Sequence, residues 1–163
     1  MVLFKTARGL GPRFGERLAD AREEQRVSDM ANPNGIKVMV IDDSNTIRRS
    51  AEIFLMQAGC RVILAEDGFD ALSKIADHQP DVIFVDIMMP RLDGYQTCAL
   101  IKKSPKFAAT PVVMLSSKDG LFDRARGRMV GSNEYLTKPF TKESLLRSVA
   151  AHAAARPGAT QAA

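Results

Sequence analysis

The chain has 163 residues, of which 45% are hydrophobic and 26% are charged. These proportions are typical of a globular protein that buries a core without disulfides or a structural metal. No run of about 18 apolar residues is present, which argues against a membrane-spanning helix. The N-terminus also lacks the apolar core of a secretory signal, so we expect a cytoplasmic protein.

The net charge is +4, from 23 basic and 19 acidic residues. The basic residues are scattered and accompany no nucleic-acid-binding motif, so we expect no nucleic-acid partner. The excess charge fits a solvated surface that meets an acidic protein partner. Cys60 and Cys98 lie far apart and outside any metal-ligand spacing, which predicts buried or half-buried thiols in a reducing compartment.

Residues 1–35 differ from the rest of the chain. Met1–Gly15 has no acidic residue, Glu16–Arg26 is dense in both charge signs, and residues 32–35 form a cluster of helix breakers. These features predict an N-terminal extension that is disordered or loosely helical, with a short exposed helix at Glu16–Arg26. Two further interpretations stay open: an organelle transit peptide, against which the acidic residues argue, and a translation start at Met30.

A regular pattern occupies residues 36–155. Short apolar runs predict strands at Lys37–Ile41, Arg61–Ala65, Asp81–Asp86, Val112–Leu115 and Glu134–Thr137. Segments with apolar residues on one helical face predict helices at Asn45–Ala58, which Ser44 would cap, and at Phe69–Asp77, Gly94–Lys103, Leu121–Val130 and Lys142–Ala155. Pro157 and Gly158 begin a flexible tail, residues 156–163.

Strands and helices thus alternate five times. Near-continuous apolar strands between amphipathic helices indicate a parallel sheet that is covered on both faces. Such a sheet binds its ligands outside the carboxyl ends of the strands, where the strand order reverses. We therefore predict one α/β domain at residues 36–155, with its site at that edge.

Acidic residues fall at the same edge. Asp42 and Asp43 directly follow the first strand, and Asp86 ends the third, which is its neighbour in this architecture. Three converging carboxylates repel each other and need either a cation or raised pKa values. Oxygen ligands of this kind suit Mg²⁺, which keeps several waters and accepts phosphate oxygens as further ligands.

Taken singly, each of these residues has an ordinary interpretation. A pair such as Asp42 and Asp43 is more often a turn and a helix cap. Ser116 and Ser117 would cap the next helix, and Lys138 would be a surface lysine. Their joint placement at the ends of strands one, three, four and five favours a shared site.

Five segments carry a more specific indication: Val40–Ser44, Asp86–Pro90, Leu92–Gly94, Met114–Ser117 and Tyr135–Phe140. In composition and interval they resemble the CheY-like response-regulator receiver family, over all of residues 36–155. The resemblance implies a flavodoxin-like doubly wound (βα)5 three-layer sandwich, whose five-stranded parallel sheet has the order 2-1-3-4-5.

The resemblance also implies a role for each acidic residue. Asp86 would accept a phosphoryl group as a covalent acyl phosphate, from a phosphohistidine on a partner kinase. Asp43 and Asp86 would hold Mg²⁺ directly, and Asp42 largely through water. The backbone carbonyl of Met88 would add a further ligand.

Three residues beside the acids would act on the phosphoryl group. Lys138, joined to Pro139 by a cis peptide bond, would pair with a phosphoryl oxygen as a point charge. Ser116 would hydrogen-bond the phosphoryl group once it is attached, and the small Ser117 leaves room beside it. Lys138 and the metal ion would together offset the negative charge of the transferring phosphoryl group.

The same resemblance implies a switch. Phosphorylation adds negative charge and strong acceptors, Ser116 would move toward them, and Tyr135 would turn into the space that Ser116 leaves. That movement would reshape an output face built by the last two helices and the strand between them. Arg124, Arg126 and Arg128 lie on this face, either as contacts for an acidic peptide or, somewhat favoured, as solvated charge.

Met88 and Lys118 depart from the commonest chemotaxis receivers. Met88 is apolar where a polar residue is common, and Lys118 is basic where an acid is frequent. Both flank the path of a hydrolytic water. We therefore expect slow self-dephosphorylation, with Met88 shielding the acyl phosphate.

Longer segments narrow the pathway. Val38–Ser44, Gly68–Leu72, Asp86–Ile101 and Ser116–Phe122 resemble receivers of the bacterial chemosensory pathway that controls type IV pili and twitching motility. This implies a chemotaxis-type histidine kinase or histidine phosphotransfer domain as the donor, and pilus regulatory proteins as downstream partners. Since a helix and a tail follow Phe140, we expect output through the receiver surface itself.

Three other functions were weighed. A flagellar chemotaxis or phosphate-sink receiver would share the chemistry and differ in its partner. A haloacid dehalogenase-type phosphatase needs a second aspartate two residues after its nucleophile, where Met88 stands. A flavodoxin needs a hydroxyl- and glycine-rich phosphate loop in place of Asp42 and Asp43. We predict no enzymatic activity beyond the chain's own phosphoryl transfer and dephosphorylation.

Overall fold

The computed structural model describes residues 34–117 and 121–153. The predicted extension lies outside this range except for Asn34 and Gly35, as do Lys118 and the predicted tail. The expected helix at Glu16–Arg26 and the boundaries of the extension and tail therefore stay predictions.

Five parallel strands form one sheet in the order β2-β1-β3-β4-β5. Their bounds are β1 (Lys37–Ile41), β2 (Arg61–Ala65), β3 (Val82–Asp86), β4 (Val112–Ser116) and β5 (Glu134–Thr137). The direction of winding reverses between β1 and β3, which are hydrogen-bonded neighbours. The strand order expected from the sequence is confirmed.

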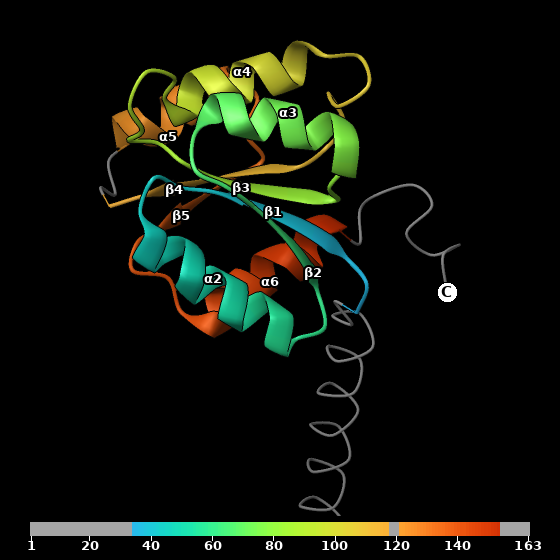
Figure 1. The fold of residues 1–163 in the computed structure, drawn as a ribbon. Helices are drawn as coiled ribbons and strands as arrows, with labels where there is room; N and C mark the ends of the chain where they lie inside the picture. The colour runs from blue at the N-terminus through green and yellow to red at the C-terminus, as the bar shows by residue number, and fades with distance from the viewer. Residues whose placement is uncertain (1–33, 118–120, 154–163) are drawn as a thin grey trace, which may run out of the picture. The chain divides into compact units, whose positions relative to one another are not determined.

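Helices cover both faces of the sheet (Figure 1). On one face lie α2 (Asn45–Gln57) and α6 (Lys142–Ala153), which contact each other. On the other face lie α3 (Gly68–His78), α4 (Gly94–Lys103) and α5 (Leu121–Met129). The result is the flavodoxin-like three-layer α/β sandwich that the sequence predicted.

The core consists of two apolar layers, because successive strand side chains point to opposite faces. In β1, Val38 and Val40 belong to the layer that contains Leu55 of α2, whereas Met39 and Ile41 belong to the layer under α3 and α4. Every residue of β3 and β4 is buried. Each large apolar side chain buried in this way contributes about 1.5–3 kcal/mol to stability.

Local hydrogen bonds fix where α2 begins and ends. The Ser44 side chain accepts a hydrogen bond from the Ile47 amide at 3.4 Å, which confirms Ser44 as the cap. The helix ends at Gln57, one residue before the prediction, because Ala58 acts as the C-cap and the chain turns at Gly59, where φ is +91°.

Other boundaries shift by one residue for similar reasons. Helix α3 begins at Gly68 because the Asp67 side chain caps it, accepting from the Asp70 amide at 2.8 Å. The remaining small corrections are the end of α3 at His78, the start of β3 at Val82, the extension of β4 to Ser116 and the end of α5 at Met129. The predicted end of α6 at Ala155 falls outside the described residues.

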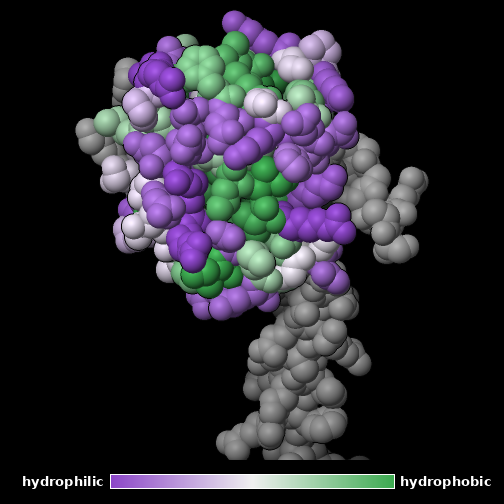
Figure 2. Space-filling view, in the orientation of Figure 1, coloured by the Kyte–Doolittle hydropathy of each residue, from purple (hydrophilic) through white to green (hydrophobic). Residues whose placement is uncertain are grey.

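Strand β2 forms an outer edge of the sheet, and Figure 2 shows an apolar patch above it, surrounded by polar residues. Within β2, the side chains of Val62, Ile63 and Leu64 are half-buried. The Leu64 carbonyl points away from β1, and Lys74 of α3 donates to it at 2.7 Å. Lys74 also pairs with Asp70 at 3.0 Å, so this outward carbonyl is occupied by a charged donor.

Gly94 allows α4 to begin directly against the end of β3. Asp93 and Gln96 form a capping box, in which each side chain accepts from the other residue's backbone amide. A Cβ atom at Gly94 would lie 2.8 Å from the Ile87 Cα and would also press on the Asp86 carbonyl oxygen. The close approach of α4 to the strand that carries Asp86 therefore depends on a missing side chain.

We predict that Gly94→Ala destabilises the fold by about 1–3 kcal/mol, because backbone atoms cannot move aside for the added methyl group. Gly127→Ala is the matched control. A Cβ there would meet the Ser132 Oγ at 3.0 Å, which is a side-chain atom that can rotate. Urea unfolding measures both; equal losses of unfolding free energy in the two variants would contradict the argument.

Candidate functional site

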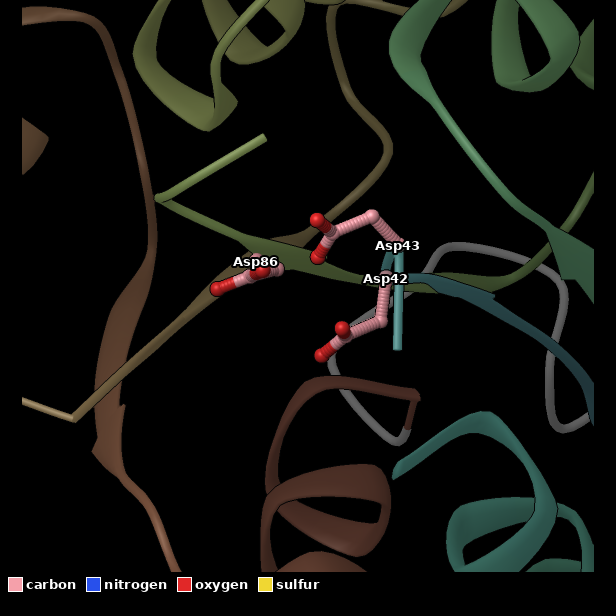
Figure 3. A group of neighbouring side chains, drawn as sticks. All are labelled: Asp42, Asp43 and Asp86. Atoms are coloured by element: carbon pink, nitrogen blue, oxygen red, sulfur yellow. The ribbon is translucent and has the colours of Figure 1, made fainter. Parts of the chain in front are cut away.

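Three carboxylates meet at the carboxyl edge of the sheet. Asp42 and Asp43 follow β1 and Asp86 ends β3, and the two strands pair in parallel with Ile41 opposite Val85. One oxygen from each carboxylate lies within 4.8 Å of the other two, as Figure 3 illustrates. Asp42 is fully buried, Asp86 is 5% exposed, and Asp43 is exposed.

Lys138 reaches into this cluster from the end of β5. Its Nζ lies 2.7 Å from the Asp42 Oδ2 and 3.0 Å from the Asp86 Oδ1, so one ammonium group bridges two carboxylates. The Lys138 amide donates to the Ser116 carbonyl at 2.6 Å, which extends the pairing of β4 and β5 into the loop. The Lys138–Pro139 bond is cis, as expected.

Burial and charge shift the ionisation of both partners. Burial, assisted by the nearby Asp42 carboxylate, raises the pKa of Asp86 from 3.8 to about 6, although Lys138 pulls it down. Burial would lower the pKa of Lys138, but its hydrogen bonds to Asp42 and Asp86 raise it above the ordinary value. Asp86 is therefore ionised at neutral pH, and its buried charge lowers the stability of the folded protein. Lys138 stays positively charged.

The two oxygens of Asp42 have different partners. Oδ1 accepts from the Ser44 amide at 2.9 Å, and Oδ2 accepts from Lys138. The Asp42 carbonyl also accepts a hydrogen bond from Arg48. Asp42 is thus anchored at both carboxylate oxygens, whereas Asp43 is exposed.

Hard oxygen donors at this spacing fit a divalent cation such as Mg²⁺, which favours carboxylates, carbonyls and water. The Met88 amide donates to the Asp86 Oδ1 at 3.3 Å, which places the Met88 backbone beside the cluster. Its side chain is 68% exposed. The three carboxylates therefore lie where a divalent cation fits, and the role of these residues as ligands stays a prediction.

Of the two expected switch residues, Ser116 lies next to the acids and Tyr135 lies farther from them. Ser116 ends β4 with 5% exposure, and its neighbour Leu115 pairs with Asp86 across the sheet. Tyr135 is half-buried on β5, opposite Met114. The structure brings Ser116 to the site and places Tyr135 one strand further away.

The three arginines of α5 are exposed, but two of them are engaged with aromatic rings. The Arg124 guanidinium lies 5.4 Å from the centre of the Tyr135 ring, and that of Arg126 lies 4.3 Å from the centre of the Tyr95 ring. The sequence suggested solvated charge or contacts to an acidic peptide. Arg124 and Arg126 are therefore more than solvated surface charges, because cation–π contacts with tyrosine rings also hold their guanidinium groups.

A cleft of about 560 Å³ opens beside the cluster. Asp43, Ser117 and the loop after β3 line it, together with Tyr95, Asp93 and Asp123, for which the sequence predicted no role in the site. Tyr95 sits at an apolar position of α4, and no motif distinguishes it from a core residue. The pairing of Tyr95 with α5 is visible only in three dimensions.

The comparisons with known proteins agree with this geometry. Residues 38–150 match the model of the response regulator receiver domain, and the chain belongs to that family. It is 71% identical over 119 residues to protein PilG of Pseudomonas aeruginosa, covering 73% of the chain and 88% of PilG. It is 37% identical over 111 residues to the response regulator MprA of Mycobacterium sp. (strain KMS), covering 68% of the chain and about half, 47%, of that relative.

Solved structures show the same architecture. The chemotaxis protein CheY4 of Vibrio cholerae has a TM-score of 0.70 at 32% identity, covering 72% of this chain and 98% of CheY4. The receiver domain of the sensor histidine kinase PA1611 from Pseudomonas aeruginosa has a TM-score of 0.68 at 28% identity, covering 73% and 98%. That second structure holds a magnesium ion coordinated in its active-site cleft. Across residues 34–117 and 121–153 of this chain, none of the helices has the length and apolar character to cross a bilayer.

We predict that Asp86→Asn stabilises the folded protein at pH 7 by about 1–3 kcal/mol in the absence of divalent cations, since each pKa unit is worth about 1.4 kcal/mol. The folded-state pKa of Asp86 is raised to about 6, so wild-type stability falls as the pH rises from about 4 to about 6. The advantage of the variant should therefore shrink below pH 4.

Urea unfolding at pH 7 and near pH 4 measures this difference. The exposed Asp43 serves as the control, since Asp43→Asn removes a charge from the same cluster with little desolvation. An Asp86→Asn variant that is less stable than wild type at pH 7 would contradict the prediction.

Proposed function

We propose that the protein is a response regulator that accepts a phosphoryl group on Asp86 and signals by binding other proteins in the cytoplasm. The observation that carries the proposal is the bridge from Lys138 to Asp86, at 3.0 Å, inside a cluster of three carboxylates. A buried aspartate beside a cation is a nucleophile whose product charge is offset where it forms.

Mg²⁺ is the proposed cofactor. Asp43 and Asp86 would hold it directly, Asp42 through water because its oxygens already bind Ser44 and Lys138, and the Met88 carbonyl would complete the protein ligands. When bound, the ion supplies positive charge beside the phosphoryl oxygens. The magnesium ion in the PA1611 receiver domain supports this assignment.

In the proposed reaction, an oxygen of Asp86 attacks phosphorus of a phosphohistidine. The new bond joins the carboxylate oxygen to phosphorus, the phosphorus–nitrogen bond breaks, and the imidazole leaves with the electron pair. Lys138 offsets the charge on the phosphoryl oxygens. Ser116, at the end of the neighbouring strand, donates a hydrogen bond to the attached group, and Tyr135 turns inward as Ser116 moves.

The proposed output is protein binding through the face made by α5, β5 and α6, which carries Arg124, Arg126 and Arg128. The proposed donor is a chemotaxis-type histidine kinase or its phosphotransfer domain, and the proposed downstream partners are regulators of type IV pili and twitching motility. Support comes from the sequence resemblance to receivers of that pathway and from 71% identity to PilG.

A flagellar or phosphate-sink receiver would use the same chemistry with other partners. Capture experiments with and without a beryllofluoride phosphoryl mimic separate these outputs. A phosphatase of the haloacid dehalogenase type is disfavoured, because Met88 occupies the position of its second aspartate and the chain matches the receiver family over residues 38–150.

We predict that acetyl phosphate with Mg²⁺ adds one phosphoryl mass to the wild-type protein and none to Asp86→Ala. Intact-mass analysis measures the adduct, and a chelator should abolish it. Asp77→Asn, an exposed change on α3, is the control and should behave as wild type. A wild-type protein that stays unmodified, or an adduct that survives in Asp86→Ala, would overturn the proposed acceptor.

We also predict that Met88→Asn shortens the lifetime of the phosphorylated protein by about threefold to tenfold, because an apolar side chain at the cleft keeps hydrolytic water away. Loss of the phosphoryl mass with time measures this lifetime. Met129→Asn changes an even more exposed methionine, 86% exposed on α5, and should have no effect. Equal lifetimes for Met88→Asn and wild type would show that the Met88 side chain does not shield the acyl phosphate from water.

A further inference from the structure

Residues 123–129 of α5, the part of the helix whose side chains the structure describes, are mostly exposed. Among its residues 123–129, only Gly127 is buried, while Arg124, Ala125, Arg126, Arg128 and Met129 are exposed. Helix α4 beside it buries Gly94, Tyr95, Thr97, Cys98 and Ile101. Over residues 123–129, polar and cation–π contacts therefore contribute to holding α5 in place.

Tyr95 makes several of those contacts. Its hydroxyl lies 3.3 Å from the Asp123 carbonyl oxygen and 3.4 Å from the Asp123 Oδ1, and its ring lies under the Arg126 guanidinium at 4.3 Å. The side chain is 4% exposed. Burial, with the Asp123 carboxylate nearby, raises the pKa of Tyr95 to about 12, so the hydroxyl keeps its proton and donates it.

The same residues form one side of the cleft beside the acidic cluster. Asp123 and Arg126 of α5, Tyr95 of α4 and the loop Met88–Pro90 all line this cleft. Helix α4, which carries Tyr95, begins against β3 with a capping box. The width of the cleft is therefore set by where the first turns of α5 lie.

We propose that Tyr95 is a positioning residue whose hydroxyl ties the first turns of α5 to α4 and thereby sets the width of the cleft that leads to Asp86. The predicted effect on phosphoryl donors rests on the proposed function, whereas the contact between the Tyr95 hydroxyl and α5 does not. Breaking the tie frees α5 to move outward, and a bulky donor gains more from the wider cleft than a small one does.

The test compares Tyr95→Phe with Thr97→Val. Tyr95→Phe removes the hydroxyl and keeps the ring under Arg126. Thr97→Val removes another buried hydroxyl of α4, which donates to the Asp93 carbonyl at 2.8 Å and not to α5. Both variants lose one hydroxyl hydrogen bond, so their comparison separates a tie to α5 from a general loss of stability.

The first measurement is amide hydrogen exchange on the full chain without a phosphoryl donor. Losing one net hydrogen bond should speed exchange in α5 by about threefold to tenfold in Tyr95→Phe. Exchange in β3 should stay as in wild type, and Thr97→Val should leave α5 unchanged. Unchanged α5 exchange in Tyr95→Phe, or equal acceleration in α5 and β3, would overturn the tie.

The second measurement compares phosphorylation by phosphoramidate with phosphorylation by the bulkier phosphoimidazole, both in Mg²⁺. In Tyr95→Phe the ratio of the two rate constants should shift at least about threefold toward phosphoimidazole. An unchanged ratio would overturn the control of cleft width. If neither donor modifies the wild-type protein, the proposed function is wrong, and so is the predicted effect of Tyr95 on the choice of donor. Hydrogen exchange would still test whether the Tyr95 hydroxyl ties α5 to α4.

Discussion

Carboxylates at the carboxyl edge of this sheet repel each other, and the positive charge of Lys138 offsets part of that repulsion. Parallel pairing of β1 and β3 brings Asp42, Asp43 and Asp86 together in spite of the repulsion between their negative charges. Lys138 lies within 3.0 Å of two of them, and still the pKa of Asp86 stays raised. The site therefore keeps an excess of negative charge, which a divalent cation or a lost proton relieves.

Hydrogen bonds and close packing hold the acidic cluster in place. Asp42 is held at both oxygens, Asp86 ends a strand in which every residue is buried, and Gly94 brings a capped helix against the Asp86 carbonyl. Charges that repel each other stay in place only where packing over-determines their positions. The apolar layers on both faces of the sheet supply that constraint.

The sequence predicted the parts of the molecule that depend on short-range pattern. Apolar runs located every strand, and because strand ends meet at one edge, the positions of Asp42, Asp86 and Lys138 followed from the order of elements. The contacts that were missed join side chains from distant elements. Tyr95 and Asp123 lie 28 residues apart, and nothing in the spacing of Arg124 and Arg126 shows that tyrosine rings lie beneath them.

The outer edge of β2 has a consequence for the behaviour of the protein at high concentration. An open strand edge with apolar side chains is a template on which another chain can add a strand and begin to aggregate. Here the outward Leu64 carbonyl is already bonded to Lys74, whose charge Asp70 balances. A second chain would have to displace the Lys74 ammonium group from this carbonyl before it could pair there, so Lys74 acts as a gatekeeper against strand addition at this edge.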